Sequence, residues 1–300
     1  MNNLTPINYI IIEGPDCSGK STLYDMIHKE SDYQWNIQDR SSLSMLVHAK
    51  FYGRDEFFHI EALKKELYNL NNQMIILLPQ WEVIAKRFNS RGDDIQNIQS
   101  LMKLYKFFSE AVEEIQTLPN VTVIRAVVDE SIVNRLVETY REIERHPMMN
   151  LSNSAKVLVA SCNDDYKERL GINFTHYDFG TFSDINEVSL DYGKEREYYK
   201  KIKTDLFGKI TEEIITNQVD NESRRFIYTD NSCISLAHFL VRGRDLDCKF
   251  FLRSSDVVDI LQYDLNFLKY LSREVYRRFE LSGYCKIDVV INSCHIPEAK

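Results

Sequence analysis

The sequence is poor in the features that mark fibrous, low-complexity and membrane proteins. Its 300 residues include only 10 glycines and 6 prolines, which excludes a collagen-like repeat and a Pro/Gly-rich disordered chain. The longest apolar runs, such as residues 74–79 and 126–128, are far shorter than the roughly 20 residues that a transmembrane helix needs. No basic segment precedes the first apolar run. We therefore expect no signal peptide, no membrane association and a cytoplasmic location.

The cysteine spacing that marks metal and redox sites is also missing. None of the 6 cysteines forms a C-x-x-C pair, which disfavours zinc-ribbon and thioredoxin-like sites. In a chain of this size without a signal peptide we expect free thiols, buried for the most part as small apolar side chains. The cysteines are Cys17, Cys162, Cys233, Cys248, Cys285 and Cys294.

The chain has no excess of positive charge. It carries 37 Lys and Arg against 45 Asp and Glu, a net charge of −8. This balance disfavours a broad surface for duplex DNA but leaves room for a local anion pocket. The hydrophobic content of 44% and the charged content of 27% are typical of globular proteins, and the length suits two domains of ordinary size.

The first half alternates short apolar runs with amphipathic stretches. The runs at 9–12, 33–38, 74–78 and 121–127 predict strands, and the apolar stripes at 60–70, 98–115 and 132–140 predict helices. This order predicts an α/β fold, a parallel sheet with helices on both faces.

The stretch 146–154 breaks this periodicity and is the best candidate for a linker, so we expect domains at 1–146 and 147–300. The second half predicts helices at 198–216 and 257–279, and strands at 225–229, 237–241, 249–252 and 286–292. That order is typical of an α+β domain with more antiparallel pairing.

A phosphate-binding motif follows the first predicted strand and opens a helix. It matches G-x-x-x-x-G-K-[ST], in which the glycines let backbone N–H groups turn toward phosphate oxygens. The lysine is expected to reach the β- and γ-phosphates, and the hydroxyl after it to bind Mg²⁺. The expected nucleotide-binding residues are Gly14, Asp16, Ser18, Gly19, Lys20, Ser21 and Thr22.

Together with this loop, two further motifs resemble those of the thymidylate kinase and deoxynucleoside kinase group of P-loop enzymes. Asp39-Arg40-Ser41-x-x-Ser44 is similar to the D/E-R-[YS] motif of that group, and residues 87–94 stand where the group carries an Arg-bearing lid. The resemblance implies ATP and Mg²⁺ as cofactors and Ser21 and Asp39 as metal ligands, with Asp39 either helping with Mg²⁺ or accepting a proton. It also implies Arg40, Arg87 and Arg91 as phosphate-contacting or catalytic residues beside Lys20.

The phosphoryl acceptor stays open. The segment between the P-loop helix and Asp39 is shorter than in typical thymidylate kinases, and this compactness also resembles polynucleotide-kinase-type enzymes. The acceptor could be a nucleoside monophosphate, a nucleoside or a nucleic-acid group. Several aromatic residues could stack on a base or belong to the core: Trp35, Phe51, Tyr52, Phe57, Phe58 and Trp81.

Several motifs of the second half resemble thymidylate synthases and related pyrimidine hydroxymethylases. Asn221-Glu222-Ser223-Arg224-Arg225 is similar to the segment whose Arg pair binds the nucleotide phosphate of the neighbouring subunit, and Arg253-Ser254-Ser255-Asp256-Val257 is similar to the R-S-x-D-V phosphate motif. By spacing, the resemblance implies Cys233 as the nucleophile and His238 as a nearby polar contact. It also implies Asp264 as the residue that reads the base and His295 as the sugar-binding histidine.

This half also departs from that family. It is shorter than a full synthase and lacks the early Glu-bearing helix, the Trp/Tyr segment and the C-terminal closing tail. We therefore expect an ATP-dependent pyrimidine deoxynucleotide kinase fused to a reduced synthase-like domain. That domain would bind or C5-modify a pyrimidine nucleotide, with dCMP as a candidate because Asp replaces Asn at position 264 and with a tetrahydrofolate donor if it is catalytic.

The resemblance further implies a homodimer through the C-terminal domain. A fusion of a kinase to a synthase-like domain is typical of phage nucleotide metabolism, which implies the host cytoplasm as the location. One alternative is a kinase acting on a nucleic acid or modified base, with the second domain as a non-catalytic binding or dimerisation module. Another is a nucleotide sensor without catalytic activity.

Overall fold

The structure, a computed structural model, describes residues 7–91, 97–145, 147–161, 170–178, 182, 210, 226–229 and 233–296. The chain divides into two compact units, Met1–Arg145 and His146–Lys300. Each unit has its own sheet. No described helix has the length and apolar character that crossing a bilayer requires.

Unit 1 contains a four-stranded parallel sheet in the order β2-β1-β3-β4. The strands are β1 (Tyr9–Glu13), β2 (Ile37–Asp39), β3 (Asn72–Leu77) and β4 (Val121–Ile124). All six residues of β3 are buried, as expected for a strand covered on both faces. The helices are α1 (Lys20–Glu30), α2 (Ser42–Phe51), α3 (Phe57–Leu67), α4 (Trp81–Arg91), α5 (Ile98–Ile115) and α6 (Glu130–Arg145).

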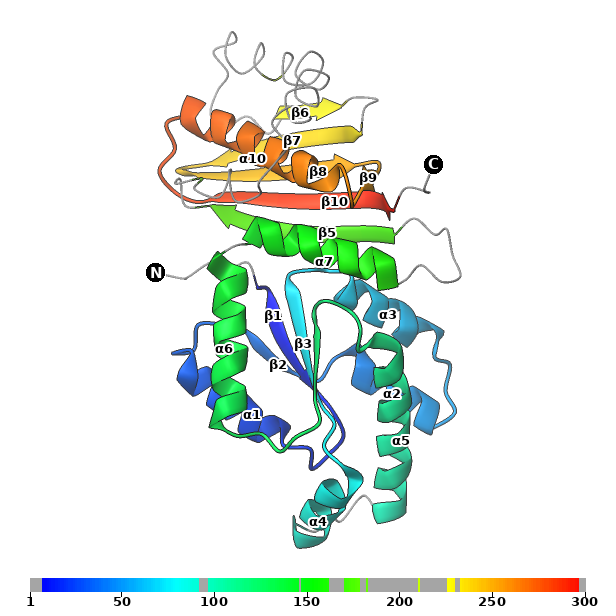
Figure 1. Cartoon of the computed structure of the whole chain (residues 1–300). Coiled ribbons are helices and arrows are strands. Elements are labelled where there is room, and N and C mark those ends of the chain that lie inside the picture. Colours follow the sequence, from blue (N-terminus) through cyan, green and yellow to red (C-terminus); the bar gives the residue numbers. More distant parts are fainter. Residues whose placement is uncertain are drawn as a thin grey trace. The chain divides into compact units, whose positions relative to one another are not determined.

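Helices cover both faces of this sheet, which confirms the predicted fold class (Figure 1). On one face α1 and α6 pack against the strands through a core that includes Leu23, Ile27, Leu136 and Tyr140. On the other face α2 packs against α3 and α5. The apolar stripe predicted for 98–115 is α5 itself, whose spacing of buried residues is the reason that it forms an amphipathic helix.

Two local predictions were wrong. The strand expected at 33–38 is only Ile37–Asp39, because Tyr33 lies in a left-handed turn (φ 58°) and Trp35 is buried in the core beside α6. The linker expected at 146–154 is instead the start of helix α7 (Pro147–Ser161). A proline at the first position of a helix is favourable because its missing N–H would have no intrahelical partner.

Unit 2 contains a six-stranded mixed sheet. Its main path runs β5-β10-β8-β7-β6, and β9 also pairs with β10. The β10–β8 and β10–β9 pairs are parallel and the others antiparallel. The strands are β5 (Leu170–Asp178), β6 (Phe226–Thr229), β7 (Ile234–Arg242), β8 (Asp245–Leu252), β9 (Ser255–Asp256) and β10 (Cys285–His295), and α10 spans Leu261–Arg278. Of the helix predicted for 198–216, the structure describes only Ile210, which is helical and buried.

Alternation along the strands builds the core of unit 2. On β8 every second residue from Leu246 to Leu252 is buried, and α10 packs against this strand. Cys248, Cys285 and Cys294 are buried and free, which confirms the prediction that they act as small apolar side chains. Cys233 is exposed, and Cys162 lies outside the described residues.

Candidate functional site

The phosphate loop lies at the position where open parallel sheets bind ligands. It follows β1, and the chain then places β2 on one side of β1 and β3 on the other, so the loop stands at a topological switch point. Gly14 (φ 137°) and Gly19 (φ 108°) both have backbone conformations that other residues rarely adopt. A Cβ at Gly14 would lie only 2.3 Å from the carbonyl oxygen of Leu77, so the loop packs directly on the end of β3.

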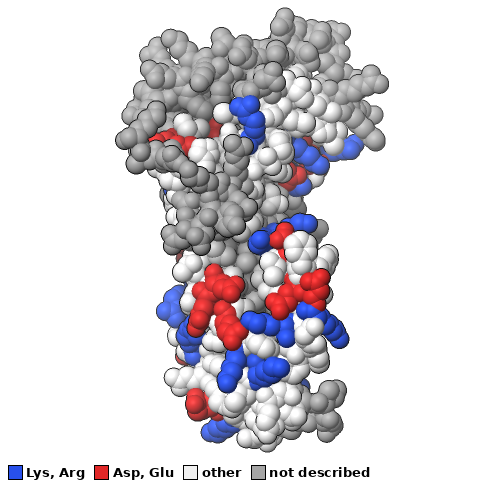
Figure 2. All heavy atoms as spheres, turned by 90° about the vertical axis from the view of Figure 1, so that its right-hand side faces the viewer, with Lys and Arg blue, Asp and Glu red and all other residues white. Residues whose placement is uncertain are grey.

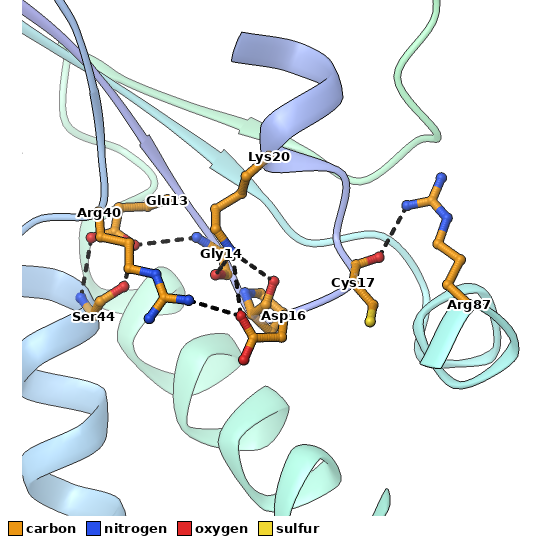
Figure 3. A network of polar contacts seen from close by, with 9 residues as sticks. Glu13, Gly14, Asp16, Cys17, Lys20, Arg40, Ser44 and Arg87 are labelled. Carbon is orange, nitrogen blue, oxygen red and sulfur yellow. Dashed lines mark hydrogen bonds and ion pairs between the residues drawn. The ribbon is translucent and has the colours of Figure 1, made fainter. Parts of the chain in front are cut away.

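Lys20 begins α1 and folds back over the loop. Its side chain is only 8% exposed, and Nζ donates to the carbonyl oxygens of Gly14 (2.9 Å) and Pro15 (3.0 Å), as Figure 3 shows. Burial lowers the pKa of Lys20, and the nearby Asp16 carboxylate opposes that shift. Because α1 has no side-chain N-cap, its first-turn N–H groups and the Lys20 ammonium together suit an anion.

Arg40 and Arg87 approach the loop from opposite sides (Figure 3). Arg40 follows β2, and its Nη2 lies 3.0 Å from Asp16 Oδ1. Arg87, on α4, donates from Nη1 to the carbonyl oxygens of Cys17 (3.1 Å) and Ser18 (2.9 Å). Two guanidinium groups and an ammonium therefore surround one short loop.

These side chains line a cavity of about 1000 Å³. The cavity brings together most residues that the sequence predicted for nucleotide and metal binding. Its lining includes Asp16, Gly19, Lys20, Ser21, Thr22, Asp39, Arg40, Arg87 and Arg91.

Several side chains in this cavity carry oxygen atoms of the kind that Mg²⁺ prefers. Ser21 and Asp39, the predicted metal ligands, share the lining with Asp16, and all three offer hard oxygen atoms. Within the described ranges no group of three or more His, Cys, Asp or Glu residues could hold a metal alone. The carboxylates of Asp16 and Asp39 suit Mg²⁺, which is usually bound through one or two carboxylates together with substrate phosphates.

A second cavity, of about 420 Å³, shares Arg40 with the first. Its lining comes from β2, α2, α3 and the segments between them, and includes His48, Arg54 and Met45, which sequence reasoning did not select. Burial lowers the pKa of His48, and the positive charge of Arg40 acts in the same direction. His48 lies nine residues after Asp39, on the helix that follows the Asp39-Arg40 motif. Its place on this helix was the only indication in the sequence that it could lie near the site.

The predicted aromatic residues divide between core and surface. Trp35 is 2% exposed and belongs to the main core, and Trp81 packs against a smaller cluster. Tyr52, Phe57 and Phe58 are 61%, 71% and 72% exposed, so they are not core residues. On the face of unit 1 in Figure 2, groups of acidic and basic side chains lie side by side without a continuous basic area.

Unit 2 gathers several predicted residues at one end of its sheet. Arg253 follows β8, and its N–H donates to the carbonyl oxygen of Cys233 (2.8 Å), which precedes β7. His295 ends β10 and pairs with β9. Cys233, Arg253 and His295 are all exposed, so the topology places a thiol, a guanidinium and an imidazole at the same end of the sheet.

Asp264 joins this end of the sheet from the first turn of α10. It is fully buried, and its Oδ2 accepts from Ser255 Oγ at 2.6 Å. Asp264 is therefore not a solvated helix residue. His238 lies in the middle of β7 opposite Lys249, five residues from Cys233, and is not brought to this end. Arg224 and Arg225 lie outside the described residues.

Two solved structures align with the N-terminal half of the chain. The YorR protein of Bacillus subtilis in complex with phosphorylated GDP is 21% identical, with a TM-score of 0.36, over 46% of this chain and 97% of that chain. Deoxyadenosine kinase from M. mycoides with bound dCTP is 16% identical, with a TM-score of 0.32, over 45% of this chain and 98% of that chain. No family model and no curated protein matches the sequence. Because these values are low, the function has to be inferred from the site itself.

Proposed function

We propose that unit 1 is an ATP-dependent kinase that transfers a phosphoryl group to a pyrimidine deoxynucleotide. The observation that carries this proposal is the convergence of Lys20, Arg40 and Arg87 on a P-loop at the end of β1. Phosphoryl transfer spreads negative charge over the transferred group, and catalysis depends mainly on positioning and on stabilising that charge. Mg²⁺, held by Ser21 and Asp39 when bound, would neutralise further phosphate charge.

Each cation has a separate part in this proposal. Lys20 supplies a point charge from the loop, and the planar guanidinium groups of Arg40 and Arg87 can each contact two oxygens. In the structure these groups donate to loop carbonyls or pair with Asp16, which holds them near the loop. A bound triphosphate would replace these weaker partners without a large rearrangement.

The acceptor would occupy the 420 Å³ cavity on the α2 side of Arg40. Arg40 lines both cavities and would therefore lie between donor and acceptor. Asp39, at the end of β2, would hold Mg²⁺ when the acceptor is a nucleotide phosphate; with a nucleoside or nucleic-acid acceptor, which attacks through a hydroxyl, it would instead accept the hydroxyl proton. His48, whose pKa burial lowers, and Arg54 would contact the acceptor directly.

The test is ADP release from ATP with a panel of deoxynucleoside monophosphates, nucleosides and oligonucleotides. Turnover with a pyrimidine deoxynucleotide, and its loss in Arg54→Ala, would support the assignment. Binding of ATP without turnover on any acceptor would contradict a kinase and favour a nucleotide sensor.

One observation favours a nucleic-acid acceptor as the second candidate. The exposed rings of Tyr52, Phe57 and Phe58 lie on the α2–α3 hairpin next to Arg54 and His59, which line the acceptor cavity. Exposed aromatic rings beside cations can stack on single-stranded bases. Faster turnover with an oligonucleotide than with any mononucleotide, reduced by Phe57→Ala, would establish this candidate.

We propose further that the sheet end of unit 2 binds a pyrimidine nucleotide. The exposed Arg253 is suited to a phosphate, and Cys233, whose backbone Arg253 contacts, is suited to attack on C6 of the base. Carbon transfer would also need a tetrahydrofolate donor, and exchange of tritium from C5 of a pyrimidine nucleotide would reveal the thiol addition without it. Absence of exchange, with binding retained, would favour a non-catalytic module.

The homodimer stays part of this proposal. The resemblance assigns Arg224 and Arg225 to the neighbouring subunit's phosphate, so a two-fold assembly would complete the site. Sedimentation of the intact chain at micromolar concentration tests it, and a monomer there would count against the dimer.

A further inference from the structure

A fully buried carboxylate stands directly before the phosphate loop. Glu13 is the last residue of β1 and is 0% exposed. Its Oε1 accepts from Ser41 N (2.5 Å), Ser41 Oγ (2.8 Å) and Ser44 N (3.2 Å), and its Oε2 accepts from Ser44 Oγ (2.6 Å) and Gly14 N (3.3 Å). Both oxygens are thus fully used within the protein, as Figure 3 shows in part.

This carboxylate stands where an apolar residue would be expected. Glu13 continues the buried run of Ile10, Ile11 and Ile12, and burying a charge without partners is costly. Burial raises the pKa of Glu13, whereas the hydrogen bonds from Ser44 and Ser41 lower it. Since the carboxylate accepts its hydrogen bonds from Ser41, Ser44 and Gly14, it joins the start of α2 to the base of the loop.

Those segments are the two halves of the proposed catalytic site. Ser41 is the N-cap of α2 and Ser44 lies in its first turn, directly after Asp39 and Arg40. Arg40 has a left-handed backbone (φ 70°), uncommon for a residue with a side chain, and its N–H donates to the carbonyl oxygen of Ile12 (3.1 Å). The end of β1 therefore holds the backbone on which Arg40 stands.

We propose that Glu13 is a positioning residue for phosphoryl transfer, which fixes Arg40 relative to Lys20 by joining the start of α2 to the base of the phosphate loop. It makes no contact with substrate and acts through Arg40. This inference rests on the proposed kinase activity of unit 1.

The test compares Glu13→Gln and Glu13→Ala in the intact chain, measuring kcat and, separately, ATP affinity without acceptor. We expect kcat to fall about 100-fold in Glu13→Ala, as for other small misplacements of catalytic groups. The fall should be smaller in Glu13→Gln, because an amide oxygen still accepts and the serine hydroxyls can rotate. ATP affinity should change by less than about 3-fold, since the phosphate-binding N–H groups remain.

The two variants separate positioning from a direct role of the charge. Equal losses in Glu13→Gln and Glu13→Ala would overturn the inference, as would unchanged kcat in both. In an Arg40→Ala background, Glu13→Gln should add little further loss, because residues that act as a unit are not additive. Full additivity would contradict action through Arg40.

A matched control is Glu144→Ala on α6. The Glu144 carboxylate also accepts two side-chain hydrogen bonds, from Trp35 Nε1 (2.7 Å) and Gln34 Nε2 (2.9 Å), but outside both cavities. The Glu144→Ala substitution should lower the melting temperature and leave kcat unchanged. If Glu13→Ala fails to fold, Glu13→Gln and Ser44→Ala carry the same comparison. An inactive wild type would overturn the kinase proposal itself, whereas an active wild type with an equally active Glu13→Ala would overturn only this inference.

Discussion

Replacement of Lys20 by alanine separates the chemistry of the phosphate loop from its stability. Lys20 Nζ donates to two loop carbonyls, and the residue is 8% exposed. Loss of hydrogen bonds to a charged donor costs about 1.5–3 kcal/mol each, but removal of the buried ammonium also removes a desolvation penalty of several kcal/mol. These terms oppose each other, so we expect a net loss of at most about 2 kcal/mol.

The effect on catalysis should be larger. A preorganised donor aimed at developing charge contributes about 100- to 1000-fold to kcat, or about 2.7–4 kcal/mol. Typical domains are stable by about 5–15 kcal/mol, so Lys20→Ala should remain folded while its phosphoryl transfer falls at least 100-fold.

The assay is ADP release at saturating ATP, with circular dichroism and thermal melting on the same samples. Lys29→Ala is the control, because Lys29 is an exposed lysine in the last turn of the same helix and does not line either cavity. It should keep wild-type turnover. A folded Lys20→Ala protein with wild-type turnover would refute the assignment of the loop.

Three further predictions concern the loop and the second unit. Gly14→Ala should abolish ATP binding and destabilise the protein, because its Cβ would lie 2.3 Å from the Leu77 carbonyl oxygen. Gly53 is also at positive φ but has no atom within 4 Å of such a Cβ, so Gly53→Ala should lower the free energy of unfolding by only about 1 kcal/mol in chemical unfolding. Because burial lowers the pKa of Lys20 and deprotonation removes its charge, kcat/KM should decline with rising pH at a midpoint below 10.5, and a midpoint at or above that value would contradict this. Unit 2 should bind dCMP more tightly than dUMP by about 1–3 kcal/mol in calorimetry on the intact chain, because a buried Asp264 carboxyl can accept from the cytosine amino group. Asp264→Asn should narrow or reverse this difference in affinity. Equal affinities for the two nucleotides, unchanged by the substitution, would rule out this role of Asp264.

Local patterns were sufficient wherever a feature depends on neighbouring residues in the chain. The P-loop motif, its place between a buried strand and a helix, and the full extent of α5 were predicted, because glycine geometry and helical periodicity act over a few turns. Where local signals competed, prediction failed. The polar stretch after His146 was interpreted as a linker, although Pro147 starts a helix there.

Other features depend on which segments the fold brings together. Glu13 was visible only as a carboxylate before a loop, and its role emerges from Ser41 and Ser44, 28 and 31 residues later. Arg87 reaches the carbonyl of Ser18 across 69 residues because α4 packs beside the loop. Hydrogen bonds over such separations are set by strand order and helix packing, for which a single sequence carries no short-range signal. The motifs therefore determined which chemistry we propose for this chain, and the tertiary structure decided which charged groups are assembled around the loop.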